Sequence, residues 1–215
     1  MDGRTVPQRA VDVLAGLKAD VVALQEVIGA GPSDSGHAEE IGAALGMGWV
    51  MASVRHLRGH QFGNVVLSHY PIRQHVQYDL SWRTCEPRCC QRADILVDNQ
   101  TLHLFNVHLG TAYRERKDQA DRLAAIVHDG RIHPPKILLG DFNEWSRFSA
   151  VSRRLKAHFD VTRRLPTFPA RAPVVGLDRV WVHPRGHLRE TRVDSSPAAR
   201  LASDHLPLVA TIECS

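Results

Sequence analysis

Apolar residues recur with a helical period in several stretches of the chain. The spacing predicts a helix from about Val6 to Lys18 and a longer one from Thr111 to Asp129, each with a polar opposite face. A shorter apolar pattern, which Ser35 can cap and Gly46 can stop, predicts another helix. A short basic helix is expected from Phe148 to Ala157.

Between the helices the chain is rich in β-branched and aromatic residues, in runs separated by Gly, Pro or Asn. These runs predict strands at Asp20 to Val27, Trp49 to Val54, Phe62 to Ser68, Ile72 to Leu80, Ala93 to Val97, Thr101 to Leu109, Ile137 to Leu139, Val174 to His183 and Leu206 to Ile212. The run from Thr101 to Leu109 mixes polar and apolar residues on both faces, so we expect helices to cover part of it. The Pro-rich segment from Phe159 to Pro173 predicts a loop.

Polar residues close two of the predicted strands. Glu26 stands near the end of the first strand, where a carboxylate needs a cation, a partner or water. We interpret it as a metal ligand in preference to an ordinary exposed strand end. His108 stands at the carboxyl end of another strand, where a lone histidine is more often a hydrogen-bonding side chain than a catalytic one.

The segment KILLGDFNEW, from Lys136 to Trp145, carries the clearest chemistry. If strand geometry persists past its apolar run, alternation puts Asp141 and Asn143 on one side and Phe142 on the other. Asp141 can accept a proton or face a metal, and Asn143 can donate and accept hydrogen bonds. The alternative is a Gly-Asp turn that Asn143 caps.

Two more acidic residues precede or lie within late strands. Asp178 is predicted in the middle of a strand, where a buried carboxylate needs a partner. Asp204 and His205 precede the last strand. Such an Asp-His pair is either an orienting contact or a metal ligand beside a general acid or base.

Composition limits the class of protein. With 215 residues, 43% of them hydrophobic, the chain suits a single domain over residues 1–215. No run approaches the roughly 18 apolar residues of a membrane span, and MDGRTVPQRA lacks the apolar segment of a signal peptide, so we expect a soluble, cytoplasmic protein. Cys85, Cys89, Cys90 and Cys214 are expected to be unpaired thiols, because no second cluster completes a zinc site.

Basic charge is concentrated in the last third of the chain. The formal net charge is +4, and the segment from Arg147 to Arg200 holds twelve Lys and Arg against four acidic residues. Such a patch can steer a phosphate ester, a nucleic acid or a lipid surface toward the protein. The alternative is a solvated arginine-rich surface, in keeping with a pI near 9.1.

The order of these signals along the chain is more specific than any one of them. The supporting segments are LQEV at Leu24 to Val27, GNVVLSHYPI at Gly63 to Ile72, NVHLG at Asn106 to Gly110, LLGDFNE at Leu138 to Glu144, LDRVWV at Leu177 to Val182 and SDHLPLVATI at Ser203 to Ile212. Together they resemble the endonuclease/exonuclease/phosphatase superfamily over nearly everything after Asp20. The wording is most similar to small bacterial members of its sphingomyelinase and lipid-anchor-processing branch.

The resemblance implies a DNase I-like fold of the α/β (α+β) type, a four-layer sandwich of two mainly antiparallel sheets faced by helices. It also implies hydrolysis of a phosphate ester with Mg²⁺ or Mn²⁺. Phosphoryl transfer gathers negative charge on oxygens, so a hard oxygen-bound cation and fixed donors suit it. By position in the family pattern, Glu26 would hold the metal with help from Asp204.

The resemblance also implies catalytic roles. Asp141 would orient or deprotonate the attacking water, and Asn143 would hold that water and a phosphate oxygen. His205, oriented by Asp178, would be the protonated group that meets the charge developing on phosphorus or on the leaving oxygen. His108 would donate to another phosphate oxygen.

One departure from the family pattern concerns the start of the chain. Family members normally begin with a strand of the type YNIH, whose Asn completes the metal site, whereas this chain opens at MDGR. We expect that this first strand is missing here, and a missing strand leaves an open sheet edge.

The substrate is less clearly indicated. The leading hypothesis is a monomeric, metal-dependent phosphodiesterase or phosphatase that acts on a small or lipid-linked ester, with a membrane surface as one partner. The chain has no long insertion rich in aromatics and lysine of the kind that grips a duplex, so a sequence-tolerant endonuclease or exonuclease comes second. An inactive family member that binds anions is the alternative of another class.

Overall fold

Helices separate the strands in several places along the chain, and five strands follow one another without a helix from Gly48 to His108. The structure is a computed structural model that describes residues 6–32, 34–146 and 149–213. In chain order its elements are α1 (Pro7–Leu17), β1 (Val21–Ile28), α2 (His37–Leu45), β2 (Gly48–Leu57), β3 (His60–Ser68), β4 (Ile72–Asp79), β5 (Cys89–Val97), β6 (Gln100–His108), α3 (Tyr113–Val127), β7 (Lys136–Asp141), α4 (Ala150–Leu155), β8 (Asp160–Val161), β9 (Asp178–His183), β10 (Leu188–Val193), α5 (Pro197–Ala202) and β11 (Leu208–Ile212).

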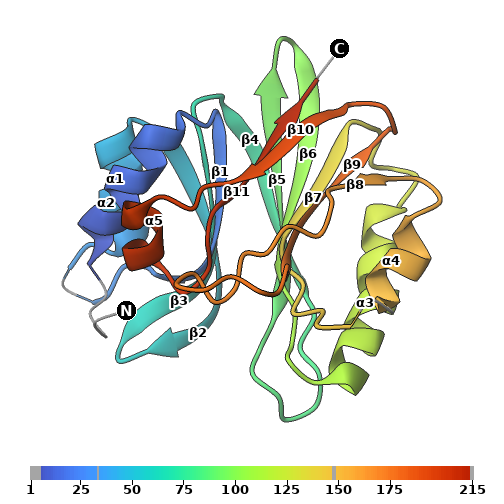
Figure 1. Cartoon of the computed structure of the whole chain (residues 1–215), viewed down its shortest axis with the longest axis horizontal. Helices are drawn as coiled ribbons and strands as arrows, with labels where there is room; N and C mark the ends of the chain where they lie inside the picture. The colour runs from blue at the N-terminus through green and yellow to red at the C-terminus, as the bar shows by residue number, and fades with distance from the viewer. Residues whose placement is uncertain (1–5, 33, 147–148, 214–215) are drawn as a thin grey trace.

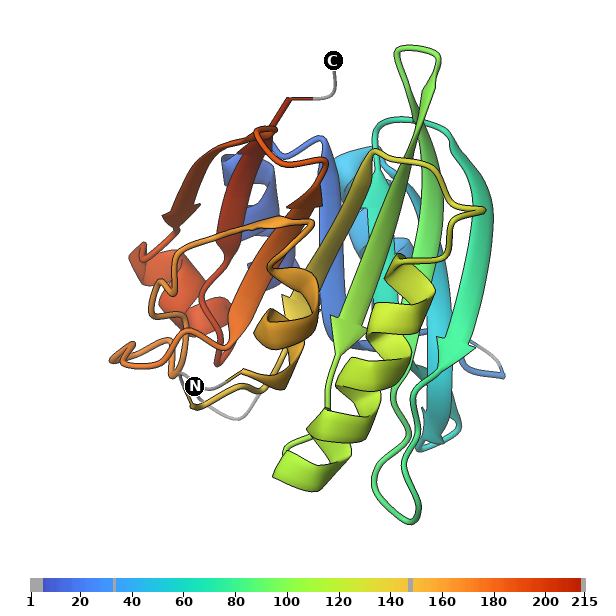
Figure 2. The ribbon, with the colours of Figure 1, turned by 90° about the vertical axis from the view of Figure 1, so that its right-hand side faces the viewer.

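The strands form two facing layers (Figure 1). One layer is a six-stranded sheet in the order β4-β5-β6-β7-β9-β8, antiparallel except for the β6 and β7 pair. The other layer contains the antiparallel sheets β1-β3-β2 and β10-β11. Helices α1, α2 and α5 lie outside this second layer. Figure 2 shows α3 running across the outer face of the six-stranded sheet. The predicted sandwich of two mainly antiparallel sheets faced by helices is therefore confirmed.

An apolar core lies on each face of the six-stranded sheet. Between the two layers, Leu104 of β6 belongs to the same buried cluster as Val66 of β3, and Ala210 of β11 packs against it. On the other face, Phe105 of β6 belongs to a cluster with Leu123 of α3. Strand β6 is thus covered on both sides, as its mixed polar and apolar pattern predicted.

Some predicted details of the elements are wrong. Gly36 and not Ser35 caps α2, because the carboxylate of Glu39 accepts the Gly36 N–H at 2.9 Å. The sequence pattern missed β8, β10 and α5. Strand β8 has only 2 residues and helix α5 only 6, so neither shows a clear pattern. Strand β10 reads LRETRV, in which charged residues outnumber the apolar ones. Of the predicted basic helix, Phe148 lies outside the described residues.

The strands β1 and β11 each lie at the edge of a sheet. Within the part of the chain that the structure describes, β1 pairs only with β3 and β11 pairs only with β10, so each has one edge without a neighbouring strand.

A buried amide joins the two layers across their apolar core. Asn106 of β6 is fully buried, and its side-chain NH₂ donates to the Leu24 carbonyl at 3.0 Å and to the Val65 carbonyl at 3.2 Å in the opposite layer. Its carbonyl oxygen accepts from the Gln25 amide at 2.8 Å. A buried polar group without a hydrogen-bond partner destabilises the folded state. These hydrogen bonds of Asn106 therefore fix the position of one layer relative to the other.

We expect replacement of Asn106 by Leu to lower the free energy of unfolding by about 2–4 kcal/mol, because several buried polar groups lose a partner together. Urea unfolding monitored by circular dichroism measures this. The matched control is Gln100→Ala, a change of an exposed amide on the same strand, which should stay within about 0.5 kcal/mol of wild type. Equal stability of the Asn106 and Gln100 variants would contradict the role given to Asn106.

Candidate active site

Three polar residues lie side by side at one end of the six-stranded sheet. β6 ends at His108, which pairs with Asp141 at the end of the parallel strand β7, and Asp178 of β9 stands opposite Asp141. Asp178 therefore opens β9, and its predicted mid-strand position is wrong, because the preceding chain folds back in a bridge between Phe168 and Val175. The hydrogen-bond register of the sheet alone brings these side chains together.

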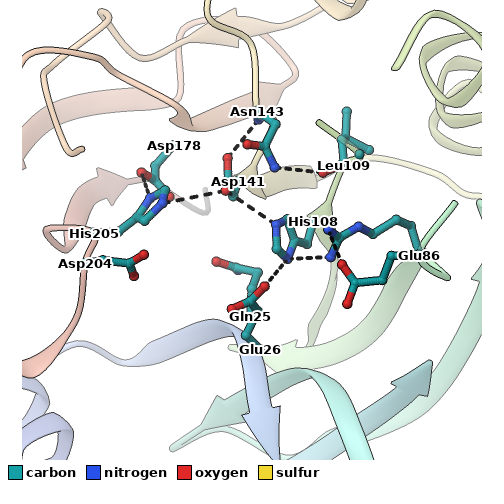
Figure 3. A network of polar contacts seen from close by, with 12 residues as sticks. Gln25, Glu26, Glu86, His108, Leu109, Asp141, Asn143, Asp178, Asp204 and His205 are labelled. Carbon is teal, nitrogen blue, oxygen red and sulfur yellow. Dashed lines mark hydrogen bonds and ion pairs between the residues drawn. The ribbon is translucent and has the colours of Figure 1, made fainter. Parts of the chain in front are cut away.

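Glu26 reaches the same place from the opposite layer. The register of β1 against β3 shifts between Leu24 and Val27, and Glu26 has a φ of 57°. Such an irregularity re-aims a side chain out of the strand alternation. One carboxylate oxygen of Glu26 lies 3.9 Å from Nδ1 of His108 (Figure 3). Burial raises the pKa of Glu26, and the nearby carboxylate of Asp204 adds to the rise.

The chain leaves the central strand at Asp141 and turns. Asn143 has a φ of 49°, and its backbone N–H donates to Oδ1 of Asp141 at 2.8 Å. The expected strand alternation at Asn143 is therefore wrong. The alternative, a Gly-Asp turn that Asn143 caps, differs as well, because Gly140 and Asp141 remain in β7 and the Asp141 side chain caps the turn that follows. The side-chain NH₂ of Asn143 donates to the Leu109 carbonyl at 2.8 Å. Phe142 points into the core beside Trp181, as predicted.

The Asp141 carboxylate lies between two imidazoles (Figure 3). Its Oδ2 is 3.5 Å from Nε2 of His108 and 3.8 Å from Nε2 of His205. On the far side of its ring, Nδ1 of His205 lies 2.8 Å from Oδ2 of Asp178. Because the Asp178 carboxylate accepts this hydrogen bond, Nδ1 of His205 donates and Nε2 faces Asp141.

Burial and neighbouring charges separate the pKa values of these groups. Burial raises the pKa of Asp141 to about 6, with repulsion from Asp178 as the second cause. Burial opposes charge on His205, but the hydrogen bond and charge of Asp178 outweigh it and raise the pKa to about 9. Burial, then the charge of Arg88, lowers the pKa of His108 to about 3. At neutral pH the site thus combines a carboxylate, a charged imidazole and a neutral imidazole.

The sequence prediction missed two residues of the site, Arg88 and Glu86. Nη1 of Arg88 lies 3.1 Å from Nδ1 of His108, and Nη2 lies 2.8 Å from a Glu86 carboxylate oxygen. The sequence signal was a charged pair in CEPRCC just before a buried strand. This signal points to the site only once the register of β5 against β6 is known. Cys90 pairs with Val107, and this pairing brings Arg88 close to His108.

Oxygen donors suited to a hard cation face the same space. Figure 3 shows the carboxylates of Glu26 and Asp204 pointing into the region below Asp141 and His205. Within the described ranges, no group of three His, Cys, Asp or Glu side chains is arranged to hold a metal ion. The donor chemistry still fits Mg²⁺ or Mn²⁺, because Mg²⁺ often takes one or two carboxylates and completes its shell with water and phosphate oxygens. Glu26 and Asp204 remain predicted ligands.

One cysteine, Cys89, lines a small cavity together with Glu26, Arg88 and His108. Cys85, Cys89 and Cys90 are free thiols, and Cys214 lies outside the described residues. Burial raises the pKa of Cys89 to about 12 and that of Cys90 well above its ordinary value, which keeps both protonated and unreactive.

Comparisons with known proteins find a matching family and similar folds. The sequence model of the Endonuclease/Exonuclease/phosphatase family matches residues 3–205. Among curated proteins, the uncharacterized protein YbhP of Escherichia coli (strain K12) is 29% identical over 225 residues, covering 94% of this chain and 86% of YbhP.

Solved structures share the fold. The mannosyl-6-phosphatase Bt3783 of Bacteroides thetaiotaomicron VPI-5482 has a TM-score of 0.69 at 16% identity and covers 96% of this chain and 89% of its own. D. rerio TDP2, solved with a single-strand DNA product, has a TM-score of 0.73 at 17% identity and covers 99% of this chain and 94% of its own. At these identities the likeness describes the fold.

We expect Asp178→Asn to lower the pKa of His205 from about 9 to well below that value, because burial then acts with less opposition. The folded-state pKa lies above the unfolded value, so the stability that this pair contributes is lost as pH rises through about 9. An NMR titration of the His205 ring in the metal-free protein measures the shift. Asp204→Asn is the control, because Asp204 raises the pKa of His205 less than Asp178 does. An unchanged pKa of His205 in Asp178→Asn would refute the pairing of His205 with Asp178.

Proposed function

Because the chain belongs to the endonuclease/exonuclease/phosphatase family, whose members hydrolyse phosphate esters, we propose that it is a divalent-metal-dependent phosphodiesterase or phosphatase for a small or lipid-linked substrate. The observation that carries this proposal is the Asp141 carboxylate held between His108 and His205. A carboxylate and two imidazoles in different charge states are the groups that in-line attack of water on phosphorus requires.

In the proposed mechanism Asp141 receives the proton of the attacking water. Its pKa of about 6 suits a general base at neutral pH. The new bond joins the water oxygen to phosphorus, and the bond from phosphorus to the leaving oxygen breaks. His205, charged at neutral pH, faces Asp141 with Nε2 and donates its proton to that leaving oxygen.

The remaining side chains stabilise the charge that develops on the phosphoryl oxygens. His108, neutral at neutral pH, offers an N–H to one oxygen. The Asn143 side-chain NH₂ spends one hydrogen on the Leu109 carbonyl and has a second one for substrate. Glu26 and Asp204 would hold the divalent cation, which when bound supplies positive charge to the phosphoryl oxygens.

A nuclease is the second candidate. The structural likeness to TDP2, solved with a DNA product, and the basic last third of the chain both favour it. None of the described helices is long and apolar enough to span a bilayer. Binding to a membrane surface stays a proposal, which the basic last third of the chain favours.

Substrate choice is tested by assaying plasmid DNA, bis-nitrophenyl phosphate, inositol phosphates and sphingomyelin side by side with Mg²⁺ and with Mn²⁺. Hydrolysis of the small or lipid-linked esters supports the leading proposal. Nicking of DNA alone would replace it with the nuclease, and binding of anions without any turnover would favour the inactive family member.

We expect Asp141→Asn and His205→Ala each to lower kcat by about 10²-fold or more, because each removes a proton-transfer group. His69→Ala, which changes an exposed histidine outside the site, is the control and should leave kcat unchanged.

Chelation by EDTA should abolish turnover, and Glu26→Gln should raise the Mg²⁺ concentration needed for half-maximal rate. Full activity of Asp141→Asn, or metal-independent turnover, would contradict the mechanism.

A further inference from the structure

Arg88 is a buried cation that the proposed mechanism does not use. It is 8% exposed and directly precedes β5. Its backbone is fixed, because its carbonyl accepts the Leu80 N–H at 2.9 Å and its own N–H donates to the Ser81 hydroxyl at 3.3 Å. A charged side chain is rarely buried so deeply unless it is paired.

The guanidinium has one carboxylate and one imidazole as partners. Nη2 lies 2.8 Å from Oε2 of Glu86, and the other oxygen of Glu86 lies 2.9 Å from Nη2 of Arg55. Glu86 is thus held between two arginines and in turn holds the plane of Arg88. Nη1 of Arg88 then lies 3.1 Å from Nδ1 of His108.

This contact decides which ring nitrogen of His108 carries hydrogen. A guanidinium has only donors and keeps its proton in proteins, so a nitrogen at hydrogen-bond distance from it has to be an acceptor. In a neutral imidazole the hydrogen then sits on the other nitrogen. For His108 that nitrogen is Nε2, which faces Asp141 at 3.5 Å.

A second group near the ring favours the opposite tautomer. Oε1 of Glu26 lies 3.9 Å from the same Nδ1 of His108, and a carboxylate would accept a hydrogen there. The guanidinium is the closer of the two and within hydrogen-bond range, whereas the carboxylate is not.

We propose that Arg88 is a positioning residue, whose guanidinium holds His108 in the tautomer that presents an Nε2–H donor on the side of Asp141 and leaves Nδ1 without a hydrogen for Glu26 to accept. Arg88 acts through His108 and not on the substrate. The two histidines of the site then do different work, one as a fixed neutral donor and the other as a charged acid. The consequence for turnover rests on the proposed hydrolase function, whereas the tautomer itself does not.

The direct test is ¹⁵N NMR of the histidine rings in the metal-free full chain, with the His108 signals assigned by their loss in His108→Asn. In the wild type, the coupling pattern should show hydrogen on Nε2. In Arg88→Met the Glu26 carboxylate, 3.9 Å from Nδ1, competes with the Asp141 carboxylate, 3.5 Å from Nε2, so the two tautomers should mix and part of the hydrogen should move to Nδ1. Arg88→Lys keeps a donor-only cation and should largely restore the Nε2–H form.

Arg55→Met is the matched control. It removes the other arginine from Glu86 without touching His108, so the Nε2–H tautomer should persist. In turnover assays Arg88→Met should lower kcat about 10- to 100-fold with little change in KM, as is typical when an orienting partner of a site residue is lost. Arg88→Lys should recover part of this loss.

The outcomes separate this proposal from the proposed function. Hydrogen on Nδ1 in the wild type, or the same tautomer in wild type and Arg88→Met, would overturn the role of Arg88 even if the variant turns over slowly. If Arg88→Met fails to fold in a thermal scan, the wild-type and Arg88→Lys spectra decide. A wild type with the Nε2–H tautomer and no hydrolysis of any ester would instead remove the proposed function.

Discussion

The register of β6, β7 and β9 is the constraint on which the rest of the site depends. It aligns His108 with Asp141 and Asp141 with Asp178, so the side chains meet without help from any loop. A slip by one residue in a strand turns its side chains to the opposite faces. Here both faces of β6 are buried against apolar clusters, and a slip would also bring Asn106 out of its hydrogen bonds. The packing of β6 away from the site therefore fixes the positions of the side chains in the site.

Burial at the strand ends gives these ordinary side chains different electrostatic roles. Removal from water alone would favour the uncharged form of each of these carboxyl and imidazole groups. Asp178 reverses that effect at His205, whereas Arg88 reinforces it at His108. A charged imidazole, His205, and a neutral imidazole, His108, thus lie on either side of Asp141, so one can donate a proton and the other a hydrogen bond.

Local patterns in the sequence were enough to predict the apolar strands that end near Glu26, His108 and Asp141. The two-sheet sandwich and the meeting of these residues in one site were predicted from the order of the motifs and its resemblance to the family. What failed depends on conformation or pairing beyond the segment. Asn143 adopts a left-handed turn that its neighbours do not specify uniquely. Arg88 joins the site only through the pairing of β5 with β6, which no local pattern encodes. The left-handed φ of Glu26 likewise depends on a shift of register against β3.

The central claim is that a divalent cation and a phosphoryl group share the space bounded by Glu26, Asp141, His108 and His205. A crystal structure of the protein with Mn²⁺ and inorganic phosphate tests it most directly, because manganese is identified by its anomalous scattering. The account predicts manganese coordinated by the Glu26 carboxylate and phosphate oxygens within about 3 Å of Nε2 of both histidines. Manganese and phosphate bound elsewhere, with this space filled by water, would contradict it.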